Sequence, residues 1–394
     1  MLLITTNFSQ FQTDQHLTTM FLLLYILLFG YNAANAVALQ CKDEKNQPVD
    51  WYVLYKLPKM PESSNPVIRY GLSYLYMTSN TVDKGWQLSL KKISAKNSIP
   101  GNTLAPLYNE SKAANIFWTL YNDHPPDRPI NTKYGHAKGV IVANKRLGFW
   151  LIHSVPNYPP TPNCGENTIK EKVDEDSAST PGNRSEYDYP SSGKNYGQSF
   201  LCISMDSDQF DLIGEQLIYN QVTVFKKNIP DEYDRLFPTL ADAARQKRIK
   251  HPPFANQVLL RSSGSVQFWS FAKSDKWQKE LYDDFVAPTL NSDLFTETWL
   301  NGRGRLPSDC AGTKVYNILS ISLSEFHIGF KSSHDHSKWA VAVENKTNQT
   351  WTCIGDINRA DTQYIRGGGT VCFNVWNVWE NYRSVVNDTE PCPK

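Results

Sequence analysis

The stretch His136-Ala-Lys-Gly-Val-Ile-Val-Ala-Asn-Lys145 has a counterpart in the second half of the chain, His336-Ser-Lys-Trp-Ala-Val-Ala-Val-Glu-Asn-Lys346. In both copies a His-x-Lys motif leads into an apolar run that ends at Asn-Lys. A tryptophan, Trp150 or Trp351, follows the histidine by 14 residues in the first copy and by 15 in the second. Because the copies share both residue types and spacing, they predict a duplicated structural unit.

Two more pairs of segments flank these copies in the same order along the chain. The segment 51–56 (WYVLYK) resembles 268–273 (FWSFAK), and 197–202 (GQSFLC) resembles 368–372 (GGTVC). An ancient internal duplication accounts for paired landmarks in a conserved order. We therefore expect an N-terminal half over residues 37–220 and a C-terminal half over residues 221–394.

Short strand-like runs alternate with helix-like runs around these landmarks. Alternation of this kind predicts an α/β or α+β layered fold, with a mixed sheet flanked by helices in each half. Residues 165–195 are rich in polar residues and glycine, so we expect a long flexible surface insertion on which no core depends. The expected strands are 51–55, 139–143, 149–153 and 200–203, and the expected helices are 210–219, 236–247 and 276–290.

Length and composition limit the function classes. The 394 residues fit two or three domains, or one large two-lobed body, and 40% hydrophobic content excludes a disordered or collagen-like chain. A formal net charge of +1 excludes a constitutively basic nucleic-acid binder, but protonation of the eight histidines would raise the charge to +9. Any affinity for a polyanion should therefore depend on pH.

The first 36 residues read as a secretory signal peptide. The apolar run 21–29 is too short to span a membrane, and Ala34-Asn-Ala36 is a small-residue cleavage signal. The polar residues before Met20 carry no Lys or Arg, so Met20 is a candidate start, and a signal anchor is the alternative. After cleavage we expect no stable membrane association. Secretion agrees with the five glycosylation sequons that follow the presumed cleavage site, at Asn109, Asn183, Asn345, Asn348 and Asn387.

The cysteines point to the same compartment. None of the seven forms a CxxC pair, which disfavours zinc ribbons and thioredoxin chemistry and favours disulfides in an oxidising environment. Seven is an odd number, so one thiol is spare. Cys164 is the expected one, because it lies in a proline-rich loop beside the polar insertion.

The paired motif suits phosphodiester chemistry. In a strand, His and Lys two residues apart project from the same face, so two halves packed face to face would bring His136, Lys138, His336 and Lys338 into one cleft. One histidine attacks phosphorus or activates an attacker, and the other protonates the departing oxygen. The lysines stabilise the charge that grows on the non-bridging oxygens, so neither a metal nor another cofactor is required.

Other interpretations stay open at this point. A single His-x-Lys is usually a partly exposed strand residue with a solvated neighbour. His334 and His336 share a strand face and are candidate metal ligands. Arg366-Gly-Gly-Gly-Thr370 is either a phosphate-approaching backbone or a tight turn into a strand, and the basic run 245–251 is either a DNA-facing patch or a solvated helix face.

Taken together, the motifs resemble the deoxyribonuclease II family. The resemblance implies a metal-independent acid endonuclease that leaves 3′-phosphate and 5′-hydroxyl ends, built as a phospholipase D-like pseudodimer and found in the lysosome or outside the cell. The segments that carry it are 41–58, Gly135-His-Ala-Lys-Gly-Val140, Gly148-Phe-Trp-Leu-Ile-His-Ser-Val-Pro156, Tyr196-Gly-Gln198, Leu306-Pro-Ser308, Asp335-His-Ser-Lys-Trp339, Trp351-Thr-Cys-Ile-Gly-Asp-Ile-Asn-Arg359 and Arg366-Gly-Gly-Gly-Thr370.

The resemblance also implies roles for single residues. His336 carries the usual catalytic assignment, with His136, Lys138 and Lys338 completing the paired site and His153 and Asp356 in support. It implies disulfides that join Cys41 to Cys202, Cys310 to Cys392 and Cys353 to Cys372, with Cys164 free. DNA is the implied substrate. RNA, a phospholipid or another phosphodiester is the alternative substrate, and a secreted or venom-like effector that acts by binding is the alternative function.

Overall fold

A computed structural model of the chain describes residues 39–163, 166–167, 186–344 and 349–393. The predicted signal peptide, Cys164 and the sequon residues Asn183, Asn345 and Asn348 lie outside the described residues. Asn109 and Asn387, the other sequon residues, are exposed. No helix within the described ranges combines the length and the apolarity needed to cross a membrane.

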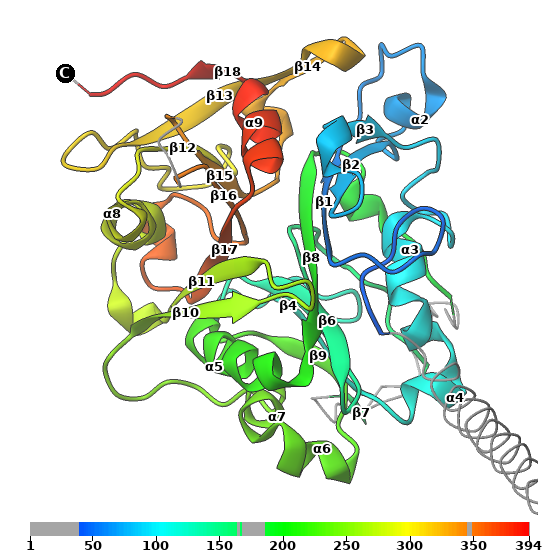
Figure 1. The fold of residues 1–394 in the computed structure, drawn as a ribbon. Coiled ribbons are helices and arrows are strands. Elements are labelled where there is room, and N and C mark those ends of the chain that lie inside the picture. Colours follow the sequence, from blue (N-terminus) through cyan, green and yellow to red (C-terminus); the bar gives the residue numbers. More distant parts are fainter. Residues whose placement is uncertain (1–38, 164–165, 168–185, 345–348, 394) are drawn as a thin grey trace, which may run out of the picture. The chain divides into compact units, whose positions relative to one another are not determined.

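The first part of the described chain builds a nine-stranded sheet in the order β3-β2-β1-β8-β6-β5-β4-β9-β7 (Figure 1). All of its strand pairs are antiparallel. The strands are β1 (Trp51–Lys56), β2 (Tyr74–Thr78), β3 (Gln87–Leu88), β4 (Phe117–Asn122), β5 (Lys138–Ala143), β6 (Leu147–His153), β7 (Glu166–Asn167), β8 (Gln198–Asp206) and β9 (Val224–Asn228).

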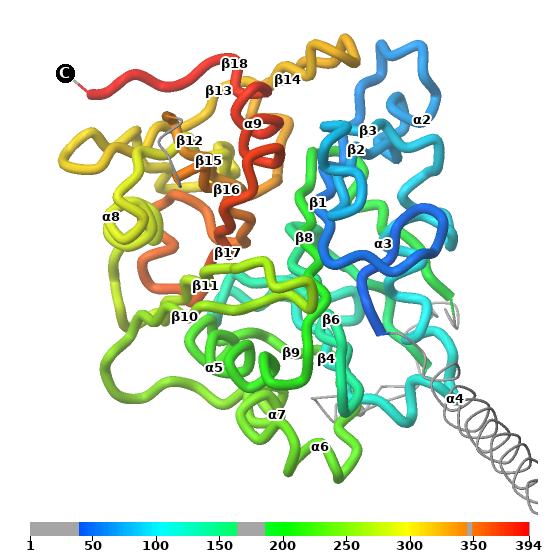
Figure 2. The backbone as a smooth tube through the Cα atoms, viewed as in Figure 1, coloured from blue at the N-terminus to red at the C-terminus, as the bar shows by residue number. Residues whose placement is uncertain are grey.

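A second nine-stranded sheet follows, in the order β10-β11-β17-β16-β15-β12-β13-β14, with β18 also paired to β13. Between the sheets the chain passes through α6 (Asp231–Leu236) and α7 (Pro238–Ala244), as Figure 2 shows. The strands are β10 (Ala255–Arg261), β11 (Gln267–Lys273), β12 (Leu294–Glu297), β13 (Val315–Leu323), β14 (Ile328–Lys331), β15 (Trp339–Ala342), β16 (Trp351–Gly355), β17 (Gly368–Asn374) and β18 (Val386–Thr389).

The two sheets repeat one strand order. The run β1-β8-β6-β5-β4 of the first sheet corresponds to β11-β17-β16-β15-β12 of the second, and the paired sequence landmarks fall on corresponding strands. The sheets differ at their edges, since β4 pairs antiparallel with β9 whereas β12 pairs parallel with β13. The described residues from Leu39 onward nevertheless form a single compact unit.

A shared hydrophobic core joins the sheets. Alternate residues of β1 point to opposite faces, as the pleat requires: Trp51, Val53 and Tyr55 belong to a cluster that also contains Trp339 and Phe373 of the second sheet. The outer face of the first sheet packs against α3 (Ile99–Leu104), and that of the second packs against a π-helical turn (Tyr282–Val286) and α8 (Ala287–Leu290). The other α-helices of the described residues are α2 (Pro66–Arg69), α4 (Glu110–Ala113), α5 (Phe210–Asn220) and α9 (Trp376–Ser384).

The layered fold class and the expected strands are confirmed, but two expected helices are not continuous. The stretch 236–247 is divided between α6 and α7, because Pro238 has no N–H to continue a helix and begins a new one. In 276–290 a 3₁₀ turn (Asp275–Trp277), the π-helical turn and α8 take the place of one helix.

The expectation that no core depends on residues 165–195 is wrong at one end of this segment. Tyr187 and Tyr189 are buried in the cluster on the outer face of the first sheet, where their rings pack around Tyr158. The polar composition of the whole stretch conceals these two aromatic anchors. All three predicted disulfides are confirmed: Cys41–Cys202, Cys310–Cys392 and Cys353–Cys372.

Candidate active site at the junction of the two sheets

The His-x-Lys motifs lie where the equivalent strands β5 and β15 begin. Lys138 is the first residue of β5 and His136 precedes it, whereas both His336 and Lys338 precede β15. The prediction that each motif lies within a strand is therefore only partly correct. Residues ahead of a strand are free of the ladder, so their backbone groups can bond to the other half instead.

The two histidines exchange equivalent backbone hydrogen bonds with opposite halves. The N–H of His136 donates to the carbonyl oxygen of Gly367 at 2.9 Å, and the N–H of His336 donates to that of Gly197 at 2.9 Å. Gly197 directly precedes β8 and Gly367 directly precedes β17, and these are equivalent strands of the two sheets. A Cβ atom on Gly197 would lie 2.3 Å from the Asp335 carboxylate, so this close approach requires glycine.

Two buried lysines donate hydrogen bonds to the loops that contain these glycines. Lys56 and Lys273 are the last residues of the equivalent strands β1 and β11. The Lys56 Nζ donates to the carbonyl of Lys194 at 2.9 Å, and the Lys273 Nζ donates to those of Gln363 (2.8 Å) and Arg366 (2.7 Å). The structural equivalence of the two sheets thus extends to the lysines that support the site.

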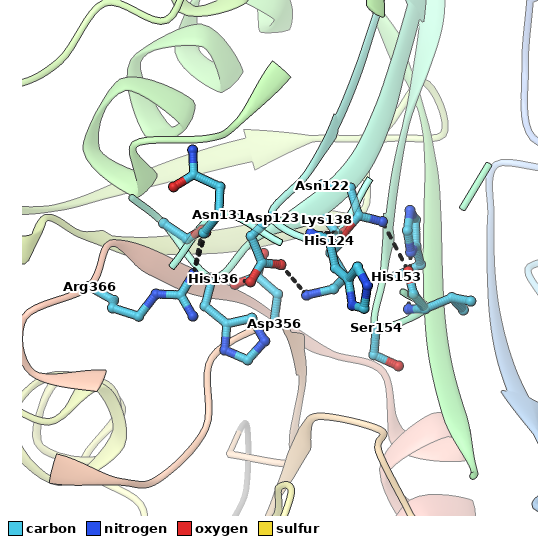
Figure 3. A network of polar contacts seen from close by, with 12 residues as sticks. Asn122, Asp123, His124, Asn131, His136, Lys138, His153, Ser154, Asp356 and Arg366 are labelled. Atoms are coloured by element: carbon cyan, nitrogen blue, oxygen red, sulfur yellow. Dashed lines mark hydrogen bonds and ion pairs between the residues drawn. The ribbon is translucent and has the colours of Figure 1, made fainter. Parts of the chain in front are cut away.

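The first motif belongs to a charged network that spans both halves (Figure 3). Lys138 forms an ion pair with Asp123, which directly follows β4, and Arg366 of the second half binds the same carboxylate at 3.0 Å. Arg366 also donates to the carbonyls of Tyr134 and Gly135, immediately before His136. Burial raises the Asp123 pKa, but the nearby charges, Lys138 foremost, outweigh it and hold that pKa well below its usual range.

The Nδ1 atoms of both imidazoles contact oxygen acceptors of the other half. The Nδ1 of His336 lies 3.0 Å from the carbonyl oxygen of Ser154, which can only accept, so in the neutral ring Nδ1 carries the proton. The Gln198 side-chain oxygen lies 3.2 Å from the same nitrogen, and the Lys338 Nζ lies 3.1 Å from it. An ammonium group only donates, so Lys338 cannot hydrogen-bond to a protonated Nδ1. The Nδ1 of His136 lies 2.9 Å from the Gln363 side-chain oxygen. Each ring therefore keeps an Nε2 lone pair when neutral.

Burial and nearby cations lower the pKa of both histidines well below 6.5. Burial is the largest cause for each; the Lys138 charge follows for His136, and the Lys338 and Lys138 charges follow for His336. The Lys338 charge also acts on His136, so the four groups share one electrostatic neighbourhood. An anion bound among them would offset these cations and raise both pKa values.

The lysines of the two motifs differ in their partners. Lys138 forms an ion pair with Asp123, whereas the Lys338 Nζ donates to the carbonyl oxygen of His336 at 2.6 Å. Burial, followed by the Lys138 charge, lowers the Lys338 pKa well below its usual value. Lys338 is thus the ammonium group whose charge would gain most from a bound phosphate.

The two supporting residues have different surroundings. Asp356 is buried, accepts the N–H of Gly369 at 3.1 Å and receives the backbone N–H of Lys138, so it links the halves. Burial raises its pKa to about 7. His153 is fully buried, with its Nδ1 accepting from the N–H of Val155 and its ring packed between Tyr158 and Phe200.

The sequence interpretation missed several groups that hold the histidines. Gln363, Gln198 and Ser154 contact an imidazole, and Asp123 neutralises Lys138. Gln198 lies in the Tyr196-Gly-Gln198 motif, Ser154 lies in the motif that runs from Gly148 to Pro156, and Asp123 directly follows an apolar strand. These are the signals that the sequence offers for them.

The alternative readings of other motifs find little support. His334 is exposed, whereas Asp335 is buried and accepts the Tyr55 hydroxyl. Across the described ranges, no three His, Cys, Asp or Glu side chains are grouped as a metal site. In the basic run 245–251, Arg245 and Lys247 form ion pairs with acidic residues of α6 and α7.

Comparisons with known proteins identify the family of the chain. The model of the deoxyribonuclease II family matches residues 40–392. Plancitoxin-1 of Acanthaster planci is 37% identical over 90% of this chain and 93% of its own length. Human deoxyribonuclease-2-beta is 35% identical over 95% and 97%, and mouse deoxyribonuclease-2-alpha is 34% identical over 91% and 94%. The chain belongs to the deoxyribonuclease II family.

Proposed function

We propose that this protein is an acid endodeoxyribonuclease that hydrolyses DNA phosphodiesters without a metal ion. The observation that carries the proposal is the reciprocal hydrogen bonding of His136 and His336 to Gly367 and Gly197, which sets two equivalent imidazole-ammonium pairs at one junction. Family membership and the names of the deoxyribonuclease-2 relatives support DNA as the substrate.

The mechanism divides the work between the histidines. One Nε2 attacks phosphorus and forms a nitrogen–phosphorus bond, while the other imidazolium gives its proton to the departing 5′ oxygen. Water then attacks the phosphohistidine and releases a 3′-phosphate, with the second imidazole accepting the water's proton. Lys138 and Lys338 stabilise the negative charge on the non-bridging oxygens throughout.

The acid requirement follows from the lowered histidine pKa values. One ring must be neutral to attack and the other must be protonated to donate. Because both pKa values lie well below 6.5 in the free protein, the protonated donor is scarce at neutral pH. Protonation also increases the attraction of the site for the phosphate backbone, so activity should fall as salt rises.

The predicted signal peptide, the sequons and the three disulfides support a secretory route that ends in the lysosome or outside the cell. An acidic compartment of that route would supply the required protons.

Plasmid cleavage in EDTA across pH 4 to 8 tests the proposal. The wild type should be fastest on the acid side and should leave 3′-phosphate and 5′-hydroxyl ends. His136→Ala and His336→Ala should each lose about 10²–10⁴ in rate. Equal rates at pH 5 and pH 8, or an active histidine variant, would contradict it.

The similarity to plancitoxin-1, which carries a toxin's name, favours one further candidate function, a secreted effector that acts by binding. One variant distinguishes the two candidate functions. If His336→Ala abolished nuclease activity but left a toxic effect on cells intact, binding would be the function. A panel of DNA, RNA and phospholipid substrates tests the remaining choice of phosphodiester.

A further inference from the structure

Two partly exposed aromatic rings meet beside His336. The Trp299 ring is edge-on to the His336 imidazole, with 5.2 Å between the ring centroids and 64° between the planes. The Tyr196 ring is edge-on to Trp299, with a centroid distance of 4.7 Å and an angle of 79°. Neither ring takes part in the proton transfers and charge stabilisation described above, so their position beside the reacting imidazole needs another explanation.

Hydrogen bonds fix the backbone beside both rings to the site. Tyr196 directly precedes Gly197, the acceptor of the His336 N–H. On the other side, the Asn301 side chain donates to the Ser333 carbonyl at 2.8 Å, and the hydroxyl of Thr298, directly before Trp299, accepts the N–H of Arg359 at 3.3 Å. The rings therefore come from different halves and are held at the same junction as the histidines.

The chemistry of this position suits a nucleobase. A phosphorus atom within reach of the His336 Nε2 brings the base of an adjoining nucleotide to within one sugar of the imidazole. Partly exposed aromatic rings bind bases by stacking, at about 1–3 kcal/mol per base and with little dependence on which base is present. Arg303 is exposed on the loop that follows Trp299, where its guanidinium can meet a further phosphate.

We propose that Tyr196 and Trp299 form a stacking platform for the base of a nucleotide next to the scissile phosphate. The proposal rests on the proposed function, since it takes DNA as the substrate. In a duplex the stacked base must first leave its neighbours, which costs a few kcal/mol and costs least at an unpaired position. The platform therefore favours substrates in which that base is unpaired.

The test combines changes in the protein and in the substrate. Oligonucleotides with one cleavable phosphodiester, the others being methylphosphonates, carry either a normal or an abasic nucleotide on the 5′ or the 3′ side of the cleavable bond. For the wild type at pH 5, removal of the stacked base should lower kcat/KM about 5- to 150-fold. On the normal substrate, the kcat/KM of Trp299→Ala should be lower than that of the wild type by the same factor. Removal of the base should then lower the kcat/KM of this variant little further.

Two control variants separate stacking from support of His336. Trp299→Phe keeps an aromatic face and should keep most of the sensitivity to base removal. Trp376→Ala removes an exposed tryptophan at the start of α9 and should behave as the wild type. If Trp299→Ala fails to fold, Tyr196→Leu tests the same platform independently.

The outcomes are distinct. If base removal lowers kcat/KM by the same factor in the wild type and in both platform variants, the rings do not stack the base and the proposal is overturned, while the proposed nuclease function stands. If the wild type cleaves none of the oligonucleotides and no plasmid, the proposed function fails as well. If base removal lowers kcat/KM only in proteins with an aromatic ring at position 299, the result supports the platform.

Discussion

The Nδ1 of His336 lies 3.0 Å from the carbonyl oxygen of Ser154, which directly follows β6 in the first sheet. A backbone carbonyl cannot donate, so this contact keeps the Nδ1 proton in place and leaves the Nε2 lone pair for the reaction. In the proposed mechanism, the backbone of one half would thus select the reactive nitrogen of the other half. Separation of the halves would release both imidazoles.

The pH dependence should differ between the free protein and its DNA complex. Lys138 and Lys338 lower the histidine pKa values, and a bound phosphodiester anion offsets their charges. The high-pH limb of kcat, which reports the complex, should therefore lie at higher pH than that of kcat/KM, which reports the free protein. Steady-state kinetics between pH 4 and 8 measure both limbs. Coincident limbs would show that bound phosphate leaves the histidine pKa values unchanged.

Lys338→Met should separate charge stabilisation from pKa control. Loss of this cation should lower kcat by about 10²–10³, as for other groups that stabilise transition-state charge. It should also raise the His336 pKa, because the Lys338 charge lowers it, and so move the high-pH limb toward neutral pH. Lys331→Met, which removes an exposed lysine of β14, is the matched control. A limb that stays in place or moves to lower pH would contradict this account.

Asp123→Asn should destabilise the junction. The change leaves Lys138 and Arg366 without their shared buried carboxylate, and breaking such a pair costs about 3–5 kcal/mol. Because the Asp123 pKa lies below its usual range, the stabilisation is present above pH 4 and is lost only as pH falls toward that lowered pKa. Urea unfolding at pH 5 and pH 7 should therefore show similar losses.

The control for this variant is Asp242→Asn, which removes the partner of Lys247 in an exposed ion pair. Exposed pairs contribute about 0–1 kcal/mol, so this variant should unfold close to the wild type. Comparable losses in the two variants would mean that Asp123 is not a buried counterion.

The sequence predicted those parts of the site that local patterns encode. The paired His-x-Lys motifs, the apolar runs after them and the landmarks of β1, β8, β11 and β17 all depend on neighbouring residues, and the duplication follows from comparing them. The disulfides and the supporting roles of His153 and Asp356 came from the family resemblance, not from spacing.

The groups around the histidines could not be predicted in the same way. Gln363 lies 227 positions from His136 in the chain, and Ser154 lies 182 from His336. Such contacts depend on how the sheets pack and on which loop reaches the junction, and a single sequence contains no signal for that packing. Tyr187 and Tyr189 were missed because average composition describes a segment and not its individual anchors.

His153→Asn tests whether this supporting residue takes part in the reaction. The asparagine oxygen can replace Nδ1 as the acceptor for the Val155 N–H, but the packing against Tyr158 and Phe200 is lost. We expect a stability loss of about 1–3 kcal/mol in urea unfolding, with kcat at pH 5 within about tenfold of the wild type, below the effect of losing a general acid or base. A loss of 10² or more in kcat in a variant of unchanged stability would instead assign His153 to the chemistry.

The difference in unfolding free energy between Asp356→Asn and the wild type should favour the variant more at neutral pH than at acid pH. Burial raises the Asp356 pKa to about 7, whereas an unfolded aspartate titrates near its model value of 3.8. As pH rises from 4 to 7 the unfolded chain releases this proton first, so the wild type loses about 1.4 kcal/mol of stability for each pKa unit of the shift. Asparagine has no such proton, and its side-chain oxygen still accepts the N–H groups of Gly369 and Lys138. The difference in unfolding free energy between variant and wild type should therefore grow over this interval and level off above pH 7; a constant difference would mean that Asp356 is already ionised at pH 5.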